Sequence, residues 1–156
     1  MRTVLLAATL TFLLDQVSKY LVVQVMNLKD LHQIDVWPPF LNFRMAWNYG
    51  INFGLFSQDS PLTRWILIAI AVAISVGVLW WISRIAANRW QLISVGILVG
   101  GALGNVIDRL IYGAVADFLN MSCCGLNNPY AFNVADIAVF AGAFGLILFT
   151  SDKNPS

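Results

Sequence analysis

Residues 104–118 read GNVIDRLIYGAVADF, and residues 132–136 read FNVAD. These two stretches place three carboxylates, two amide side chains and one arginine within or beside segments that are apolar enough to cross a bilayer. An ionisable group inside a membrane helix costs roughly 2.5 kcal/mol or more. Something must compensate that cost, so we expect these side chains to meet in one site.

The composition is that of a membrane protein. Hydrophobic residues make up 59% of the 156 residues and charged residues 11%, whereas about a quarter of the residues of a soluble protein are charged. The mean hydropathy is +0.74. A net charge of +1 gives no argument for a nucleic-acid partner, because such proteins need Lys and Arg clustered on an exposed face. The length predicts a single domain over residues 1–156.

Four apolar segments predict an all-α membrane protein with four transmembrane helices. They are residues 4–26, 65–82, 90–108 and 131–150. A cleaved signal peptide is the alternative for the first segment, but no small-x-small cleavage site follows it, so we interpret it as a retained helix. Both termini then lie on one side of the membrane. Two arginines in the short connector after the second helix, Arg84 and Arg89, place that side in the cytoplasm.

Residues 27–63 interrupt the helical pattern and carry many of the scattered polar residues. From Leu41 to Asn48, apolar side chains alternate with other residues at a period of two, which predicts a strand with one apolar face. We expect a small sheet that rests on the bilayer, with Trp37 and Trp47 as interfacial anchors. After the third helix we expect an irregular loop over 109–130. Gly113 is expected to break any continuation of that helix and to let Asp117 turn back.

Helical spacing groups the polar side chains. Asn105 lies three and four residues before Asp108 and Arg109, which places all three on neighbouring positions of a helix. Asn133 and Asp136 have the same three-residue spacing at the start of the last helix. Both groups are expected at the same membrane face.

Two further patterns concern the packing of the helices. Asp15 and Lys19 are spaced i,i+4 and can pair, either as a self-neutralising ion pair or as a polar face aimed at a water-accessible cavity. Gly100 and Gly104 form a small-xxx-small pattern that lets another helix approach closely.

Asp117 and Asp136 are the pair on which we base the predicted chemistry. Two carboxylates held a few ångströms apart share one proton and titrate together. The charged member can take a proton from water, while the protonated member hydrogen-bonds a substrate carbonyl. The sequence therefore predicts hydrolysis of a peptide bond near a membrane surface.

Other catalytic arrangements fit less well. The single histidine, His32, lies in the segment outside the membrane, and no GxSxG nucleophile elbow occurs. Ser18 and Lys19 are helical neighbours that point about 100° apart, so they do not form a dyad. Cys123 and Cys124 are adjacent, which is typical of small loop residues rather than of a metal site. No metal is expected, although magnesium or calcium among the aspartates is an open alternative.

Five blocks resemble the lipoprotein signal peptidases, or signal peptidase II, a family of intramembrane aspartyl proteases. They are Asp15-Gln16-Val17-Ser18-Lys19, Asn48-Tyr49-Gly50-Ile51-Asn52-Phe53, Gly104 to Arg109, Val115 to Phe118 and Phe132 to Asp136. The resemblance implies an enzyme without a cofactor that removes the signal peptide from prolipoproteins by cutting before a diacylglyceryl cysteine. It also implies a monomer in membrane lipid that is inhibited by globomycin-type cyclic peptides.

The same resemblance implies the fold and the roles of individual residues. The fold is a bacterial inner-membrane bundle of four spans with a periplasmic β-cradle, a short interfacial helix and an active site near the periplasmic face. The catalytic pair is Asp117 and Asp136. The supporting polar positions are Asn105, Arg109, Asn133, Asp108, Asn48, Asp15 and Lys19. Asn52 departs from the family, which commonly has alanine there, and for Asp108 a structural role and a role as a third acid both stay open.

Two hypotheses from other classes compete with this one. A proton-coupled transporter or channel also uses intramembrane carboxylates, but it is expected to show internal repeats with polar residues near the bilayer midplane. An assembly subunit uses buried polar residues only to join helices, which leaves the duplicated Asn-x-x-Asp arrangement without a purpose. The clustering of the polar residues at one surface favours hydrolysis.

Overall fold

The computed structural model describes residues 1–50, 61–123, 125 and 128–151. Three residues of the second block, Ile51, Asn52 and Phe53, lie outside the described residues, as does Cys124. The elements in chain order are α1 (Arg2–Lys19), η1 (Tyr20–Val25), α2 (Leu28–Leu31), β1 (Gln33–Trp37), β2 (Leu41–Asn48), α3 (Pro61–Arg84), α4 (Arg89–Tyr112), β3 (Val115–Asn120) and α5 (Val134–Ser151).

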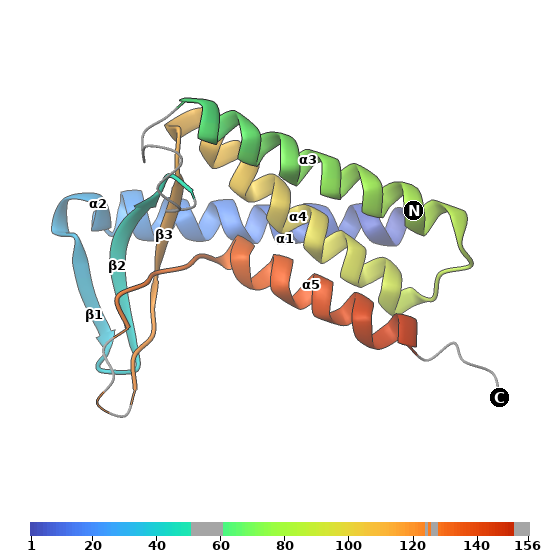
Figure 1. Ribbon diagram of the computed structural model, residues 1–156. Coiled ribbons are helices and arrows are strands. Elements are labelled where there is room, and N and C mark those ends of the chain that lie inside the picture. Colours follow the sequence, from blue (N-terminus) through green and yellow to red (C-terminus); the bar gives the residue numbers. More distant parts are fainter. Residues whose placement is uncertain (51–60, 124, 126–127, 152–156) are drawn as a thin grey trace.

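The helices occupy the four apolar segments (Figure 1). In the described part of the chain, three of them are long and apolar enough to cross a membrane: α1 with η1, then α3 and α4. The fourth, α5, is a shorter apolar helix over Val134–Thr150. The structure is therefore mostly helical, with three long apolar helices and a small sheet.

The core of the bundle forms around α4, which packs between α1 and α5. A side chain at Gly100 would collide with the backbone of Ala8 in α1, and one at Gly101 would collide with the backbone of Ala135 in α5. A side chain at Gly104 would collide with the carboxylate of Asp15. The close approach predicted from Gly100 and Gly104 is thus confirmed, and α1 is the helix that uses it.

The sheet has the order β1-β2-β3, with both pairs antiparallel. The strand predicted over Leu41–Asn48 is confirmed as β2. Its side chains Phe43 and Met45 pack on a buried apolar cluster that includes Val22, Leu28 and Phe118. This cluster ties the sheet to the end of η1 and to α2.

The expectation of an irregular loop over 109–130 was wrong in part. The helix α4 continues to Tyr112, and Val115–Asn120 forms the third strand of the sheet. This strand is buried on both faces, so its sequence lacks the alternation of apolar and polar residues that marks a half-exposed strand. Gly113 ends α4 as predicted, in the left-handed conformation with φ of 81°.

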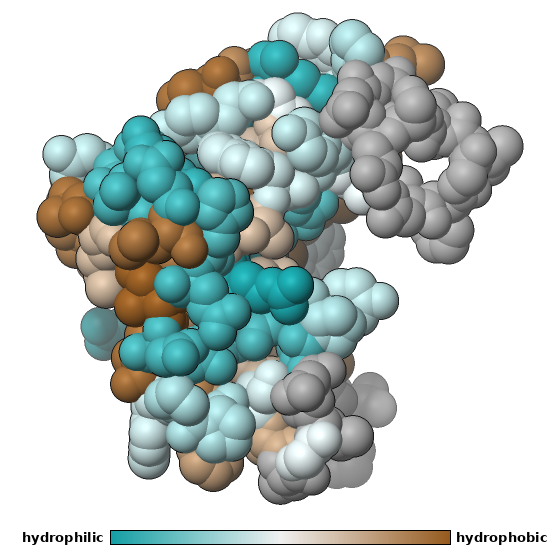
Figure 2. All heavy atoms as spheres, turned by 90° about the vertical axis from the view of Figure 1, so that its left-hand side faces the viewer, coloured by the Kyte–Doolittle hydropathy of each residue, from teal (hydrophilic) through white to brown (hydrophobic). Residues whose placement is uncertain are grey.

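The sheet lies across one end of the bundle, and the N terminus and the far end of α5 both lie at the other end (Figure 1). The side of the molecule that carries the sheet is largely hydrophilic, with apolar residues in separate patches (Figure 2). Exposed polar residues therefore gather at the end of the molecule that carries the sheet.

Candidate active site

Asp117 and Asp136 come from different elements but are joined by a single residue. Asp117 lies in β3, and Asp136 lies in the first turn of α5. The side-chain amide of Asn133 donates to Oδ1 of Asp117 at 2.6 Å. The backbone N–H of Asn133 donates to Oδ2 of Asp136 at 3.2 Å, and the N–H of Asp136 donates back to Oδ1 of Asn133 at 2.9 Å. This reciprocal cap begins the helix and holds both carboxylates at its N-terminus.

Two more asparagines complete the hydrogen bonds of the carboxylates. Nδ2 of Asn105 donates to Oδ1 of Asp136 at 2.9 Å, and Nδ2 of Asn48 donates to Oδ2 of Asp117 at 3.0 Å. The side chains of Asn105 and Asn133 also bond each other at 3.3 Å. Each carboxylate therefore accepts two N–H donors, and its orientation is fixed before any ligand binds.

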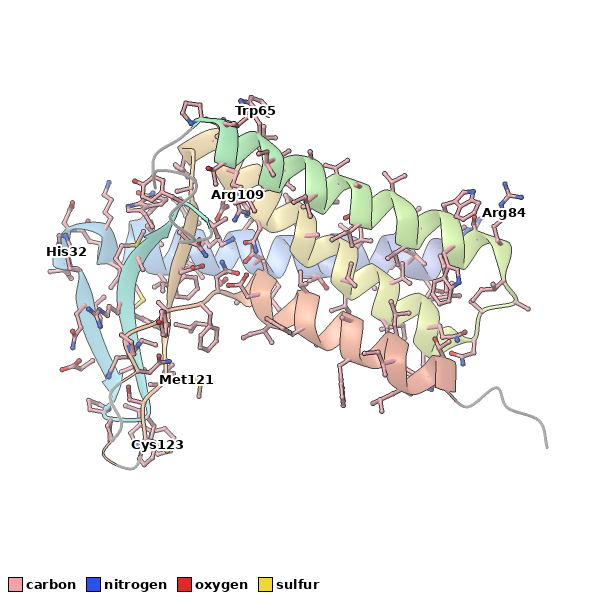
Figure 3. All side chains as sticks on the ribbon, in the orientation of Figure 1. His32, Trp65, Arg84, Arg109, Met121 and Cys123 are labelled. Carbon is pink, nitrogen blue, oxygen red and sulfur yellow. The ribbon has the colours of Figure 1, made fainter. Side chains whose placement is uncertain are left out.

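Arg109 is the cation of this site. It lies on α4 close to the sheet, among side chains with oxygen and nitrogen atoms, whereas Arg84 lies at the opposite end of the bundle (Figure 3). Its Nη1 donates to the backbone carbonyl of Asn105 at 3.3 Å. Asp136, Asp117 and Asp108 are close enough to interact electrostatically with its charge. The predicted grouping of Asn105 and Arg109 is thus observed, with the arginine bonded to the asparagine's backbone.

The pKa of Asp117 is raised from 3.8 to about 7. Burial is the main cause, since only 3% of this residue is exposed, and the charge of Asp136 adds to it. The hydrogen bonds from Asn48 and Asn133 favour the charged form and oppose the rise. Near neutral pH, Asp117 therefore holds a proton in a large share of the molecules.

The two carboxylates face concave surfaces of different character. A cleft of about 450 Å³ lies beside Asp117 and is lined by Asn48, Tyr49 and Tyr130. An apolar groove of about 610 Å³ runs along α5 beside Asp136 and is lined by three phenylalanines, Ile137 and Ala141. The arrangement can hold a polar chain at one carboxylate and an apolar one at the other.

Asp15, Lys19 and Asp108 form a second polar group next to this pair. The predicted pairing of Asp15 with Lys19 is observed at 2.8 Å, and Nζ of Lys19 lies equally close to Asp108. Helical spacing did not predict the Lys19–Asp108 pair. Nor did it predict a role for Gln16, whose side chain donates to Oδ1 of Asp108 at 3.1 Å. Its position next to Asp15 in the first block was the only signal for Gln16.

The histidine that a Ser-His-Asp arrangement would require lies apart from this site. His32 lies at the outer end of the sheet (Figure 3), and its ring contacts the carbonyl of Asp30. Across residues 1–50, 61–123, 125 and 128–151, no three His, Cys, Asp or Glu side chains are grouped as ligands of a metal ion.

Comparisons with known proteins identify the family. The family model described as signal peptidase (SPase) II matches residues 7–151. A lipoprotein signal peptidase of Methylorubrum extorquens is 43% identical over 149 residues, which cover 94% of this chain and 84% of that protein. One from Alteromonas mediterranea is 42% identical over 142 residues, covering 90% and 76%.

Solved structures agree with these sequence matches. Two structures described as bacterial membrane enzymes superpose with TM-scores of 0.79 and 0.83, at 29% and 28% identity. The first match covers 100% of this chain and 94% of the other, and the second covers 99% and 96%. The likeness therefore extends over the bundle and the sheet together. With the family model matching almost its whole length, the chain belongs to the signal peptidase II family.

Proposed function

We propose that Asp117 and Asp136 carry out the reaction of this family, the removal of signal peptides from prolipoproteins by an aspartyl peptidase. The observation that supports them is the set of hydrogen bonds through Asn133, which joins one carboxylate on a strand to another at a helix start. A pKa of about 7 allows Asp117 to hold the single proton that such a pair requires.

The proposed reaction starts with Asp117 protonated and Asp136 ionised. Asp136 takes a proton from a water molecule, whose oxygen attacks the carbonyl carbon, while Asp117 gives its proton to the carbonyl oxygen. The tetrahedral intermediate then loses its C–N bond as Asp136 passes the proton to the leaving nitrogen. Asp117 recovers its proton from the hydroxyl that becomes the new carboxyl carbonyl. Arg109 offsets the negative charge that the pair carries.

The two concave surfaces support a substrate that is part peptide and part lipid. The cleft beside Asp117 suits the extended chain around the scissile bond, and the groove beside Asp136 suits apolar chains in the bilayer. We propose a diacylglyceryl prolipoprotein, whose lipid orients the peptide bond before chemistry. We also propose that the protein acts as a monomer and that globomycin-type cyclic peptides compete with the substrate for the cleft.

The family and the long apolar helices make this a multi-pass protein of the bacterial inner membrane. We further propose that α5 is a fourth span and that residues 1–156 act as one domain. The apolar part of α5, Val134–Thr150, is about 25 Å long at 1.5 Å per residue, near the lower limit for crossing. Arg84, the N-terminus and the far end of α5 lie opposite the sheet, so we propose that the sheet and the carboxylates face the periplasm.

This topology predicts which cysteines a membrane-impermeant maleimide labels in intact cells. In a background with serine at positions 123 and 124, Lys29→Cys on α2 is expected to react, because it is exposed beside the sheet. Ser83→Cys, exposed at the other end of the bundle, is expected to react only after the cells are opened. Labelling of Ser83→Cys from outside would contradict the proposed orientation.

The raised pKa of Asp117 predicts the pH dependence of cleavage. Because the reaction needs Asp117 protonated, kcat is expected to fall as pH rises through about 7, by up to about tenfold per pH unit well above that value. The measurement is cleavage of a synthetic diacylglyceryl prolipoprotein peptide between about pH 5 and about pH 9. Asp35→Asn, an exposed carboxylate in β1, is the matched control and is expected to keep the profile.

The same assay tests the proposed reaction itself. A single cut before the lipidated cysteine is expected, with little cleavage of the peptide that lacks the lipid. A rate that is flat or increasing above neutral pH would count against Asp117 as the proton holder. Proton or solute movement in liposomes without any cleavage would favour the transporter hypothesis.

A further inference from the structure

The charged group behind the proposed catalytic pair is almost completely enclosed. Asp15, Lys19 and Asp108 are 0%, 6% and 1% exposed. Nζ of Lys19 lies 2.8 Å from an oxygen of each carboxylate and 3.4 Å from Oδ1 of Asn105. The ammonium group of Lys19 therefore has three acceptors, one from α1 and two from α4, and these contacts hold it in position.

Each of these two carboxylates also accepts a backbone N–H from a second element. Oδ1 of Asp15 accepts from the N–H of Ala135 at 2.9 Å. Oδ2 of Asp108 accepts from the N–H of Ala116 at 3.2 Å. Both alanines are buried, at 0% and 3% exposure. The cluster thus reaches the start of α5 through one acid and the strand β3 through the other.

The two alanines hold equivalent places in the sequence. Residues 115–117 and residues 134–136 both read Val-Ala-Asp. Ala116 immediately precedes Asp117, and Ala135 immediately precedes Asp136. The backbone N–H of the residue before each proposed catalytic aspartate therefore donates to a carboxylate, that of Asp108 or Asp15. Lys19 forms an ion pair with both of these carboxylates.

We propose that Lys19 is a positioning residue that sets the separation of Asp117 and Asp136, by holding together the two acids that bind the peptides in front of them. This inference depends on the proposed function of the aspartate pair. In this proposal Lys19 acts on α5 through Asp15 and on β3 through Asp108.

Lys19 acts through other residues rather than on the substrate. It lines a separate cavity of about 170 Å³ together with Gln16, Tyr20 and Ala116, whereas Asp117 lines the larger cleft. Successive residues of a strand point to opposite faces, and accordingly Ala116 lines the cavity of Lys19 while Asp117 lines the cleft. A role in substrate binding is not expected of a side chain on the far side of that strand.

The test uses two variants and one control. Lys19→Met removes the charge at nearly constant length, but it leaves two buried carboxylates facing each other and can unfold the protein. Asp15→Asn/Lys19→Met keeps the net charge of the cluster and the shape of the acid, and it removes only the bridge. Lys29→Met, an exposed lysine on α2, is the matched control.

We expect the folded double variant to lose about 30-fold in kcat, with KM changed by less than about threefold, because the cleft is intact while the pair is misaligned. Its pH profile is expected to shift to higher pH, since the charge of Lys19 lowers the pKa of Asp117. The readout is cleavage of the lipidated peptide per folded molecule, with folding checked by thermal unfolding in detergent. Lys29→Met is expected to match the wild type.

A folded double variant with wild-type kcat and pH profile would overturn the inference, as would a change confined to KM. A purely structural role would lower the thermal stability without changing kcat per folded molecule, and that result would also overturn it. Failure of the proposed function has a different signature, which is cleavage by the Asn variants of Asp117 or Asp136. Inactive Asn variants together with a fully active Lys19 variant would reject the positioning role alone.

Discussion

Cleavage of a lipidated prolipoprotein is expected to drop by a factor of at least about 10³ in Asp136→Asn, because the base that takes the proton from water is lost. The substitution is nearly isosteric. The carbonyl oxygen of the new amide can still accept the N–H of Asn133 or the side chain of Asn105, the two partners of the native carboxylate. The start of α5 should therefore remain formed, and the loss should be one of chemistry rather than of folding.

Asp117→Asn is expected to be as damaging, for the opposite reason. An amide can donate a hydrogen bond to a carbonyl, but it cannot give up a proton to the developing oxyanion. The assay is mass spectrometry of the cleaved peptide over long incubation, with thermal unfolding in detergent as the check on folding. Asp35→Asn serves as the control, since Asp35 is exposed and contacts Gln33 rather than the site. Measurable turnover by either active-site variant would end the proposal of a two-aspartate mechanism.

Apolar segment length predicted the helices well, because bilayer thickness constrains a membrane helix more strongly than any local propensity. The segment predicted at 65–82 is observed as Pro61–Arg84, and the one predicted at 4–26 as α1 followed by η1. The prediction for the third helix ended too early, at 108. The predicted span stopped where the charged residues Asp108 and Arg109 begin. Both are bonded inside the molecule, to Lys19 and to the carbonyl of Asn105, so the helix continues to Tyr112.

Sequence spacing could not predict which residues of different elements contact each other. Helical periodicity relates Asp15 to Lys19 and Asn133 to Asp136, and these pairs are observed. It says nothing about Lys19 with Asp108, or Asn133 with Asp117, because these partners come from different elements. The strand β3 was also not predicted, because a strand buried on both faces shows no alternation of apolar and polar residues. The geometry of the site thus depends on how the helices pack.

Gly104 is where that packing is most restrictive, and Gly104→Val is expected to lower both stability and activity. A Cβ at this position would overlap Oδ2 of Asp15 and approach the side chain of Ala135. Either α1 and α4 separate or the carboxylate turns away, and the second change would break its bonds to Lys19 and to the N–H of Ala135. Overpacking of this kind costs about 1–3 kcal/mol, and misplacement of the pair is expected to reduce cleavage at least about 100-fold.

Gly77→Val in α3 separates this effect from the general cost of valine in a helix. Nothing lies within 4 Å of a Cβ built at Gly77, so both substitutions carry the same change in propensity but only one creates a collision. We expect Gly77→Val to retain wild-type cleavage and nearly wild-type thermal stability. If Gly104→Val were equally harmless, the helices could adjust at no cost, and the position of Asp15 beside α4 would not matter for catalysis. If Gly104→Val is stable but inactive, the defect comes from the displaced carboxylate of Asp15, because the fold is then intact while Asp117 and Asp136 are misaligned.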